Sequence, residues 1–512
     1  MLFSDHRSHS RPLNLHLWSE HPEINIIADK MWQALGENRQ ANLIPKGNRK
    51  GTNPKLLLKV LLLNLYVTFL DLPTLWTGVA RSANAFAPTS RYNSLRISFK
   101  TIKLIDGLVE LGYLDFIGGS NDKNNDGWNS FTSRIRPSHI LKVEFGKCTA
   151  DFFDIFNHKS KIAVLLSDFD VDLKGKLIRR RGNKLRQLIE YKDTSETQSM
   201  ELMLYAYNSL LQRTYIDIGP LEKAYVELDT KLGVKRLPIN QSNKFVSRIF
   251  SRGSWSNNGR FYGGFWQQVE QNYRGNILIN DKPTIEVDYS GIHVAILSIN
   301  KGETFNGYEL EQIILPHLNR GQQTKALKFL VMTAIYASSK QQAYKAFRGS
   351  SDITLTDQEL DKLLNKFLDL NSHLSDDLFS DMGVNLMYTE SLIVEHVIKK
   401  FTYTDLPILS GNQSFIVQYD QILKLKEYMT EASKAVLGKP FNYERDLYDP
   451  VKAVQFEHID QDLYDSLMRK PPEVLRSERY GRTYNKYRLW MERNNQGAKP
   501  YRIIDGLRKR TT

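Results

Sequence analysis

The chain has 512 residues, of which 41% are hydrophobic, 25% charged and 11% aromatic. This composition excludes wholesale disorder, and the length indicates two or three domains rather than one core. Lysine and arginine number 70 against 57 acidic residues, a net charge of +13. The excess favours a polyanionic partner, because phosphate contacts release counterions; a solvated basic surface is the alternative.

The single cysteine, Cys148, excludes an intrachain disulfide and a cysteine-rich zinc site, and it suits the reducing cytoplasm. The longest apolar stretch, Leu56–Leu70, is interrupted by Lys59 and Asn64. It is too short to span a bilayer. We therefore expect a buried helix there and no membrane partner.

Residues 1–145 show the element order of a winged helix. An apolar helix over 56–69 is followed by a helix that begins after Ser98, a strand at Tyr113–Ile117, a polar hairpin and a second extended segment at Ile140–Phe145. Cations lie before and along the second helix, where nucleic-acid contact is expected: Arg96, Lys100 and Lys103. A small helical domain with an ordinary basic face is the alternative.

Residues 146–245 are expected to form a helical linker or thumb-like region. Within it, Arg179, Arg180 and Arg181 form a basic run that is either a solvated loop or a grip on a nucleic-acid backbone. The C-terminal extension, 446–512, is again basic. Arg482 and Lys486 are candidate nucleic-acid contacts there, with aromatic residues interleaved for stacking: Tyr480, Tyr484, Tyr487 and Trp490. A surface helix of mixed polarity is the alternative.

The most informative segment is Thr284–His293. Ile285 and Val287 alternate with Glu286 and Asp288, which predicts a strand that ends on a carboxylate. The apolar run after His293 predicts a helix. A carboxylate at a strand end is a place where a hard cation and a triphosphate can meet.

This segment resembles the first catalytic motif of template-dependent polymerases, which reads Asp-Tyr-Ser-x-Ile-Glu in family A and Asp-x-x-Ser-Leu-Tyr in family B. The resemblance implies that Asp288 is a catalytic ligand of Mg²⁺ or Mn²⁺. It also places His293 where these families have a bulky residue that screens the 2′-hydroxyl of the nucleotide.

A second segment, Arg320–Tyr336, resembles the family A fingers helix. That helix carries Arg-x-x-x-Lys and a tyrosine eight residues after the lysine. Lys328 and Tyr336 keep this spacing, whereas Thr324 stands in the place of the arginine. On a helix Lys325 and Tyr336 are separated by about 20° and Lys328 and Tyr336 by about 80°. The resemblance implies catalytic roles for Lys328 and Tyr336 and nucleotide binding by Arg320 and Lys325.

Residues 252–266 are rich in glycine, arginine and aromatic residues and resemble a segment that precedes the palm in polymerase-like proteins of phages and mobile elements. Arg252 and Arg260 are candidate phosphate ligands. Trp255, Phe261, Tyr262 and Trp266 are candidate stacking residues. A glycine-rich hairpin packed by its aromatic residues is the alternative.

The third polymerase motif, His-Asp-Ser at a hairpin turn, matches only in position. Asn412 and Gln413 stand where the histidine and aspartate are expected, and Gln413 offers one neutral oxygen. Three interpretations stay open: a carboxylate from elsewhere substitutes, the site binds nucleotide or template without turnover, or the resemblance concerns the fold alone. The nearest substitutes in sequence are Glu390, Asp405 and Asp420.

The sequence therefore predicts an α+β fold: a winged-helix-like α/β module followed by a polymerase-like palm with a helical fingers insertion over 246–445. The predicted function is template-directed transfer of nucleotides from nucleoside triphosphates onto a primer 3′ end, with DNA as primer-template or single strand. One alternative is a catalytically inactive, DNA-binding replication or defence protein of a mobile element. Another is a plain winged-helix regulator. The expected location is the cytoplasm of a bacterial or phage-infected cell.

Overall fold

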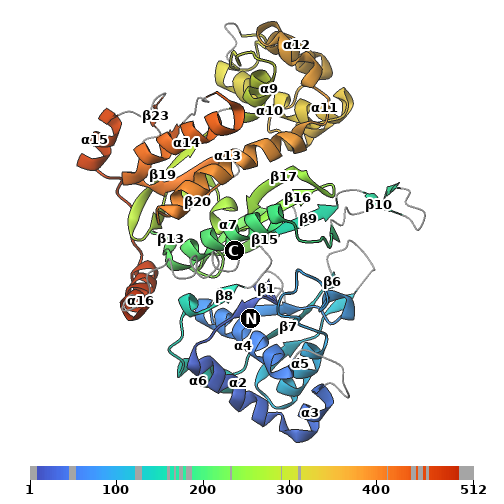
Figure 1. Cartoon of the computed structure of the whole chain (residues 1–512), viewed down its shortest axis with the longest axis vertical. Coiled ribbons are helices and arrows are strands. Elements are labelled where there is room, and N and C mark those ends of the chain that lie inside the picture. The colour runs from blue at the N-terminus through green and yellow to red at the C-terminus, as the bar shows by residue number, and fades with distance from the viewer. Residues whose placement is uncertain are drawn as a thin grey trace.

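The computed structural model spans the chain and describes residues 9–44, 53–121, 130–157, 162–166, 169–171, 177–179, 187–230, 233–289, 291–308, 313–411, 413–439, 445–447, 454–456 and 461–494. For the short strands within 162–187 and 445–456 only the backbone is described. The fold is mixed α+β, and two large apolar cores correspond to the lower and upper lobes of Figure 1.

The lower lobe is built around α4 (Pro54–Asp71), the apolar helix expected from the sequence. It is buried over most of its length, and the Asn53 side chain caps its first turn by accepting a hydrogen bond from the Lys55 N–H at 3.0 Å. Among the described residues, no helix has both the length and the apolar character required to cross a membrane. The other helices of this lobe are α2 (Pro22–Ala34), α3 (Gly36–Leu43), α5 (Lys100–Glu110) and α6 (His139–Gly146).

A four-stranded sheet completes the lower lobe, in the order β1-β3-β7-β4. β1 runs parallel to β3, and the other neighbours are antiparallel. The helix α5 lies between β3 and β4 in sequence and buries Ile102, Leu104, Ile105 and Leu108. The strands are β1 (Ser10–Pro12), β3 (Trp76–Val79), β4 (Leu114–Ile117) and β7 (Ser133–Pro137).

The prediction of an extended segment at Ile140–Phe145 is wrong, because these residues lie in α6. Leu141, Val143 and Phe145 alternate with polar residues, which is typical of a strand. In the structure Leu141 and Phe145 are buried, whereas Val143 is 47% exposed. Burial at i and i+4 is the helical period, and the Phe145 ring packs edge-on against Tyr66 of α4. The strand that pairs with β4 is β7 instead.

The upper lobe contains a five-stranded antiparallel sheet in the order β13-β18-β19-β21-β20. The strand expected to carry chemistry, β19, lies at its centre, and its direct neighbour β21 begins just after the turn that contains Gln413. The side chains of β19 that point to one face, Ile285 and Val287, are fully buried in the core of the lobe. The strands are β13 (Ile216–Ile218), β18 (Ile277–Ile279), β19 (Lys282–Asp288), β20 (Ile408–Ser410) and β21 (Ser414–Gln418).

A long helix, α13 (Gly383–Tyr403), joins this sheet to a second one. α13 packs against β17 of the second sheet and against α14 (Ile422–Leu437), as Figure 1 shows. The second sheet has the order β12-β9-β16-β17, and its longest hairpin is β16 (Ser247–Ser251) and β17 (Ser254–Tyr262). The remaining two strands are β9 (Ile162–Leu166) and β12 (Gln187–Leu188).

Among the described residues, four α-helices lie between β19 and α13 in sequence, and α10, α11 and α12 are at the top of Figure 1. The first of the four follows β19 directly and enters the core, whereas the others pack mainly on one another. They are α9 (Ile292–Asn300), α10 (Arg320–Tyr336), α11 (Lys340–Ser350) and α12 (Asp357–Leu370).

The region 146–245 is not the helical linker expected from the sequence. Within the described parts of this region the one long helix is α7 (Ser195–Arg213), and most of the other elements are strands. The apolar face of α7 belongs to the same core as the central sheet, and the Tyr207 hydroxyl donates to the Ile408 carbonyl at 2.8 Å. From α7 onward the region is therefore part of the upper lobe, whereas Ala150, Phe152 and Ile155 belong to the core of the lower lobe.

The C-terminal extension contains α15 (Gln461–Arg469) and α16 (Glu478–Asn494). The stacking role predicted for the aromatic residues of α16 is wrong for most of them, because Tyr480, Tyr487 and Trp490 are buried. They form a separate core with Phe153 and Tyr215. Their spacing matches the contact face of a helix rather than an open stacking surface.

Candidate functional site

The predicted strand that ends on a carboxylate is β19, with Asp288 as its last residue. The register pairs Asp288 with Ser414, the first residue of β21. The backbone N–H of Tyr289 donates to the carbonyl of Gln413 at 3.1 Å. The structure thus brings the first and third motifs together; Ser290 and Asn412 lie outside the described residues.

The turn from β19 into α9 is fixed on both sides. Tyr289 is 1% exposed, and its hydroxyl donates to the Met429 carbonyl of α14 at 2.8 Å. Gly291 has φ of 55°, and a Cβ there would lie 3.2 Å from Val294 and 3.3 Å from Tyr308. A side chain at this position would thus meet both strain and crowding. Tyr289 and Gly291 thus constrain the backbone between Asp288 and the start of α9.

Glu286 belongs to the same face as Asp288, because residues two apart on a strand point the same way. Its Oε1 accepts a hydrogen bond from the Ser414 hydroxyl at 2.7 Å, and its Oε2 pairs with Arg274 Nε at 2.9 Å. Since Ser414 is the register partner of Asp288, the Glu286 carboxylate reaches toward Asp288. Glu286 was not predicted as a site residue. The alternation of the strand already indicated that Glu286 and Asp288 share a face.

The substitutes considered for the missing third-motif carboxylate lie elsewhere. Asp405 pairs with Arg213 at 2.9 Å near the end of α13. Asp420 pairs at 2.6 Å with Lys282, the first residue of β19. Lys282 and Asp288 are six residues apart on the extended strand β19, so Asp420 lies about 20 Å from Asp288. Neither can serve the Asp288 site in this fold.

The third candidate, Glu390, lies in a buried network with His293. Glu390 is 0% exposed, and its Oε2 is 2.8 Å from His293 Nε2 and 2.5 Å from a terminal nitrogen of Arg260. Its other oxygen is buried without a hydrogen bond to any described residue. His293 Nδ1 is 3.3 Å from the Tyr336 hydroxyl, and burial raises the pKa of that hydroxyl. The network holds His293, the side chain predicted to screen the sugar, in contact with Tyr336 at the end of α10.

The helix α10 carries three cations before Tyr336. Arg320, Lys325 and Lys328 are exposed, and the ammonium of Lys328 lies 5.7 Å from the ring centre of Tyr308. Lys328 and Tyr336 are about 12 Å apart along the helix axis, because each residue rises 1.5 Å. The side chain of Asn319 caps the helix by accepting from the Gln322 N–H at 2.9 Å. Lys325 and Lys328 lie on the half of α10 that includes Tyr336, whereas Arg320 lies about 160° away from Tyr336 around the helix axis.

The arginine-rich segment upstream is the β16–β17 hairpin, and its arginines are paired. Arg252 makes two hydrogen bonds of 2.8 Å to Asp381, whereas Arg260 is committed to Glu390. Phe261 and Trp266, predicted to stack on bases, are buried, and the Trp266 indole donates to the Ser410 carbonyl at 2.9 Å. The alternative of a hairpin packed by its aromatic residues is thus correct for these two side chains.

The predicted nucleic-acid contacts differ in availability. Arg96 and Lys103 are exposed, whereas the ammonium of Lys100 donates to the Leu43 carbonyl at 2.6 Å. On α16, Arg482 and Lys486 are 69% and 57% exposed. Of the basic run, only the backbone of Arg179 is described, and Arg180 and Arg181 lie outside the described residues.

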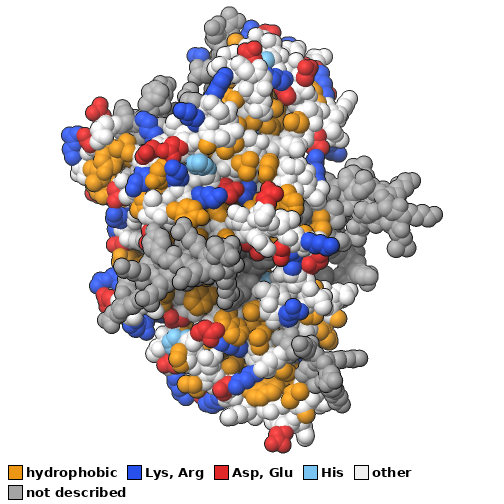
Figure 2. All heavy atoms as spheres, viewed as in Figure 1, with side chains coloured by type: hydrophobic (Ala, Val, Ile, Leu, Met, Phe, Trp, Pro, Cys, Tyr) orange, Lys and Arg blue, Asp and Glu red, His pale blue; other side chains and the backbone are white. Residues whose placement is uncertain are grey.

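Charges of both signs are mixed on the visible surface. Figure 2 shows lysine and arginine side chains interspersed with aspartate and glutamate over the coloured residues of this face. Part of the net positive charge of the sequence comes from segments outside the described residues, such as 180–186 and 495–512. No protein-family model matches the chain, and a search of curated proteins found no significant match.

Proposed function

We propose that this protein transfers nucleotides onto the 3′ end of a DNA primer at the Asp288 site. The observation that carries the proposal is the pairing of β19 with the β20–β21 hairpin, which sets Asp288 beside Gln413 and Ser414. A strand-end carboxylate next to a hairpin turn, followed by a helix that touches a second, cationic helix, is the arrangement that a polymerase-like palm and fingers require.

The donors at the site are suited to Mg²⁺ or Mn²⁺. Asp288 and Glu286 offer carboxylate oxygens, and Gln413 can add an amide oxygen, which are the ligands of hard cations. A bound cation would neutralise charge on the triphosphate and favour deprotonation of the attacking hydroxyl. Glu286 would then supply the second carboxylate that the third motif lacks.

The remaining residues would position the nucleotide. Lys325 and Lys328, on the half of α10 that includes Tyr336, would neutralise the triphosphate. Tyr336, which is half-buried, would lie at the new base pair, and His293, buried and held by Glu390, would hold the Tyr336 hydroxyl in place rather than contact the sugar. In the transfer, the primer 3′-oxygen bonds to the α-phosphorus, and the bond from that phosphorus to the pyrophosphate breaks.

The lower lobe is proposed to hold DNA as a winged helix. Its elements α4, β3, α5, β4 and β7 follow in that order, and β7 lies between β3 and β4 in the sheet. The exposed side chains of Arg96 and Lys103 lie just before and on α5, the helix that would enter a groove. We expect this binding to weaken steeply as salt rises.

Primer extension on the full chain with Mg²⁺ or Mn²⁺ tests the proposal. The wild type should extend a primer; Asp288→Asn should abolish extension, and Glu286→Gln should reduce it by at least about 100-fold. Asp369→Asn is the matched control, because Asp369 is an exposed aspartate on α12. Equal extension by the wild type and Asp288→Asn would refute the assignment.

A catalytically inactive DNA-binding protein is the second candidate, and the neutral Gln413 favours it. In that case the wild type binds DNA but does not extend it with either metal. Gain of extension by Gln413→Asp would then identify a palm that lost its second carboxylate. DNA binding without extension in both proteins would leave a scaffold function alone.

A further inference from the structure

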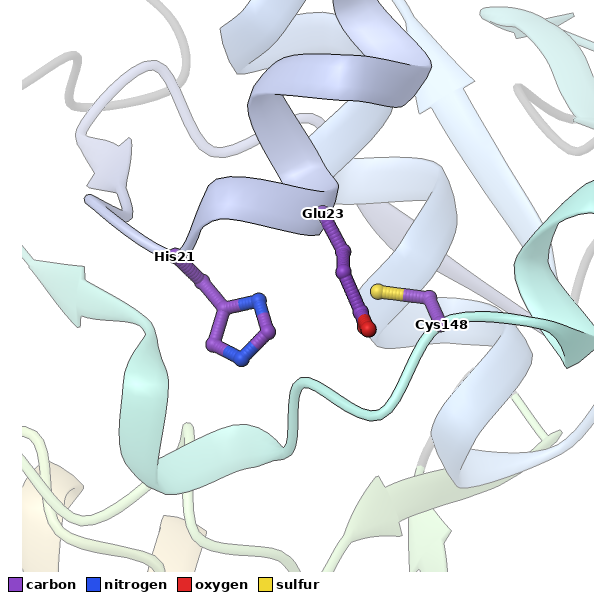
Figure 3. Close-up of side chains that lie close together, drawn as sticks. All are labelled: His21, Glu23 and Cys148. Carbon is purple, nitrogen blue, oxygen red and sulfur yellow. The ribbon is translucent and has the colours of Figure 1, made fainter.

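The lower lobe contains a group of three metal-ligating side chains remote in sequence from the Asp288 site. His21, Glu23 and Cys148 each offer one ligand atom, and these atoms all lie within 4.8 Å of one another. Figure 3 shows the imidazole, the carboxylate and the thiol converging from two segments of the lobe. We propose that they bind one divalent cation that accepts nitrogen and sulfur ligands, such as Zn²⁺ or Co²⁺.

The mixed donor set selects the class of cation. Imidazole nitrogen, thiolate sulfur and carboxylate oxygen are the three ligand types of zinc sites, whereas Mg²⁺ and Ca²⁺ prefer oxygen alone. Ligand atoms around a tetrahedral zinc are roughly 3.5 Å apart, as follows from bonds of about 2.0–2.3 Å. The observed group would thus close by about 1 Å on binding, a shift that rotation of side chains can supply. Three protein ligands leave a fourth position for water.

The surroundings of two of the ligands, Glu23 and His21, favour a bound cation. Glu23 Oε2 accepts hydrogen bonds from the Thr149 N–H at 2.6 Å and from the Thr149 hydroxyl at 3.0 Å. These bonds, the backbone N–H first, lower the pKa of Glu23 and keep it ionised. His21 Nδ1 is buried and makes no hydrogen bond within the described part of the chain. A bound cation would give a buried nitrogen of this kind the partner it lacks.

The third ligand must lose a proton. An ordinary thiol has a pKa of about 8.5, so Cys148 carries its proton at neutral pH in the free protein. On binding, the S–H bond breaks, a sulfur–metal bond forms and the proton leaves to solvent. Affinity should therefore increase with pH.

The backbone around the site is fixed from the centre of the lobe. Tyr66 of α4 is 1% exposed, and its hydroxyl donates to the carbonyl of Ala150 at 2.6 Å, two residues after Cys148. His21 directly precedes α2, and Glu23 lies in its first turn. A cation here would tie α2 to the segment through which the chain leaves the lower lobe, and it would stabilise the folded lobe by mass action.

Titration of the full-length, chelator-treated protein with Co²⁺ tests the proposal. One equivalent should produce a sulfur-to-cobalt charge-transfer band in the near ultraviolet. Cys148→Ser should remove the band, and His21→Gln and Glu23→Gln should each weaken binding by at least about 10-fold. His139→Gln is the matched control, because His139 is an exposed histidine of the same lobe. It should leave both the band and the affinity unchanged.

A measurement on the wild type alone guards against variants that fail to fold. Zn²⁺ should slow the reaction of Cys148, the only cysteine, with a thiol reagent, and it should release about one proton per bound ion. Absence of the cobalt band together with an unchanged thiol rate would overturn the proposal. So would a Zn²⁺ affinity that is equal in the wild type and all three ligand variants.

Discussion

At the scale of single residues, the protein buries several charged groups, and their partners determine what each can do. Lys244 is 0% exposed, and its ammonium donates to the carbonyls of Gln212 and Thr214 and to the side-chain oxygen of Gln241. Burial lowers its pKa well below the ordinary value. It therefore acts as a local clamp on the end of α7 rather than as a reactive amine near the proposed site.

Asp71, at the end of α4, is a buried acid whose charge the fold disfavours. Its Oδ2 accepts hydrogen bonds from Arg11 and Asn240, and burial raises its pKa to about 7. Its Oδ1 is buried without a hydrogen bond to any described residue. An asparagine could keep the accepting oxygen at the Oδ2 position and remove the titration.

We expect Asp71→Asn to abolish part of the pH dependence of stability. The folded-state pKa of Asp71 lies above the unfolded value of about 4. The contribution of protonated Asp71 to the free energy of unfolding is therefore complete below pH 4 and is lost as the pH rises to about 7. Relative to the wild type, the variant should gain free energy of unfolding between pH 4 and pH 8, on the order of 1–4 kcal/mol. Urea unfolding at several pH values measures the difference. A constant difference between the two proteins would contradict the assigned pKa.

At the scale of elements, contacts between helices hold the proposed site together. The ring of Tyr336, at the end of α10, lies between His293 of α9 and the first turn of α13. A Cβ at Gly383 would come within 2.3 Å of this ring. The end of α10 can thus reach His293 only because α13 begins with a residue that has no side chain.

Gly383→Ala should therefore displace Tyr336 and destabilise the protein by about 1–3 kcal/mol, because the added methyl group overpacks the contact. Gly349→Ala is the matched control: that glycine lies in α11, and its Cβ would meet nothing within 4 Å. It should be neutral or stabilising by up to about 1 kcal/mol, since alanine favours a helix. Thermal unfolding of the two variants distinguishes them. Equal melting temperatures would show that the contact with Tyr336 is not needed.

At the scale of the whole molecule, α16 ties distant parts of the chain together. Trp490 packs on Phe153, with ring centres 5.3 Å apart, and its indole donates to Asp154 at 2.9 Å. Arg479 makes two hydrogen bonds to Asp217, the buried central residue of β13. One helix thus joins the segment that leaves the lower lobe to the edge of the central sheet.

Trp490→Ala should destabilise the folded chain by about 3–5 kcal/mol, because a buried indole and its packing are lost. Leu489→Ala, at a neighbouring position that is 49% exposed, should cost far less. The free energy of unfolding by urea, followed separately in each lobe, measures both effects. If Trp490→Ala leaves the free energy of unfolding of both lobes unchanged, α16 does not stabilise the contact between the two parts of the chain.

The sequence by itself determined those helices and strands whose formation depends on residues close together in the chain. Apolar periodicity and end signals located α4, α5 and β19, because the period of an element depends on residues close in the chain, whereas α10 was expected from a resemblance to the fingers helix. It also located Asp288 at a strand end, and the strand itself is confirmed. At Ile140–Phe145 the apolar residues fit both the period of a strand and that of a helix. The sequence pattern predicted the wrong element there, because packing against α4 selects the helix.

Only the tertiary structure decided which side chains meet. Asp288 and Gln413 are more than 120 residues apart, and their proximity follows from the register of β19 with β21. The same holds for Glu390 with His293, for Glu286 with Ser414, for Cys148 with His21 and Glu23, and for the aromatic residues of α16 with Phe153 and Tyr215. The physical reason is that long-range contacts depend on how whole elements pack, whereas a sequence pattern reports mainly which face of each element seeks burial.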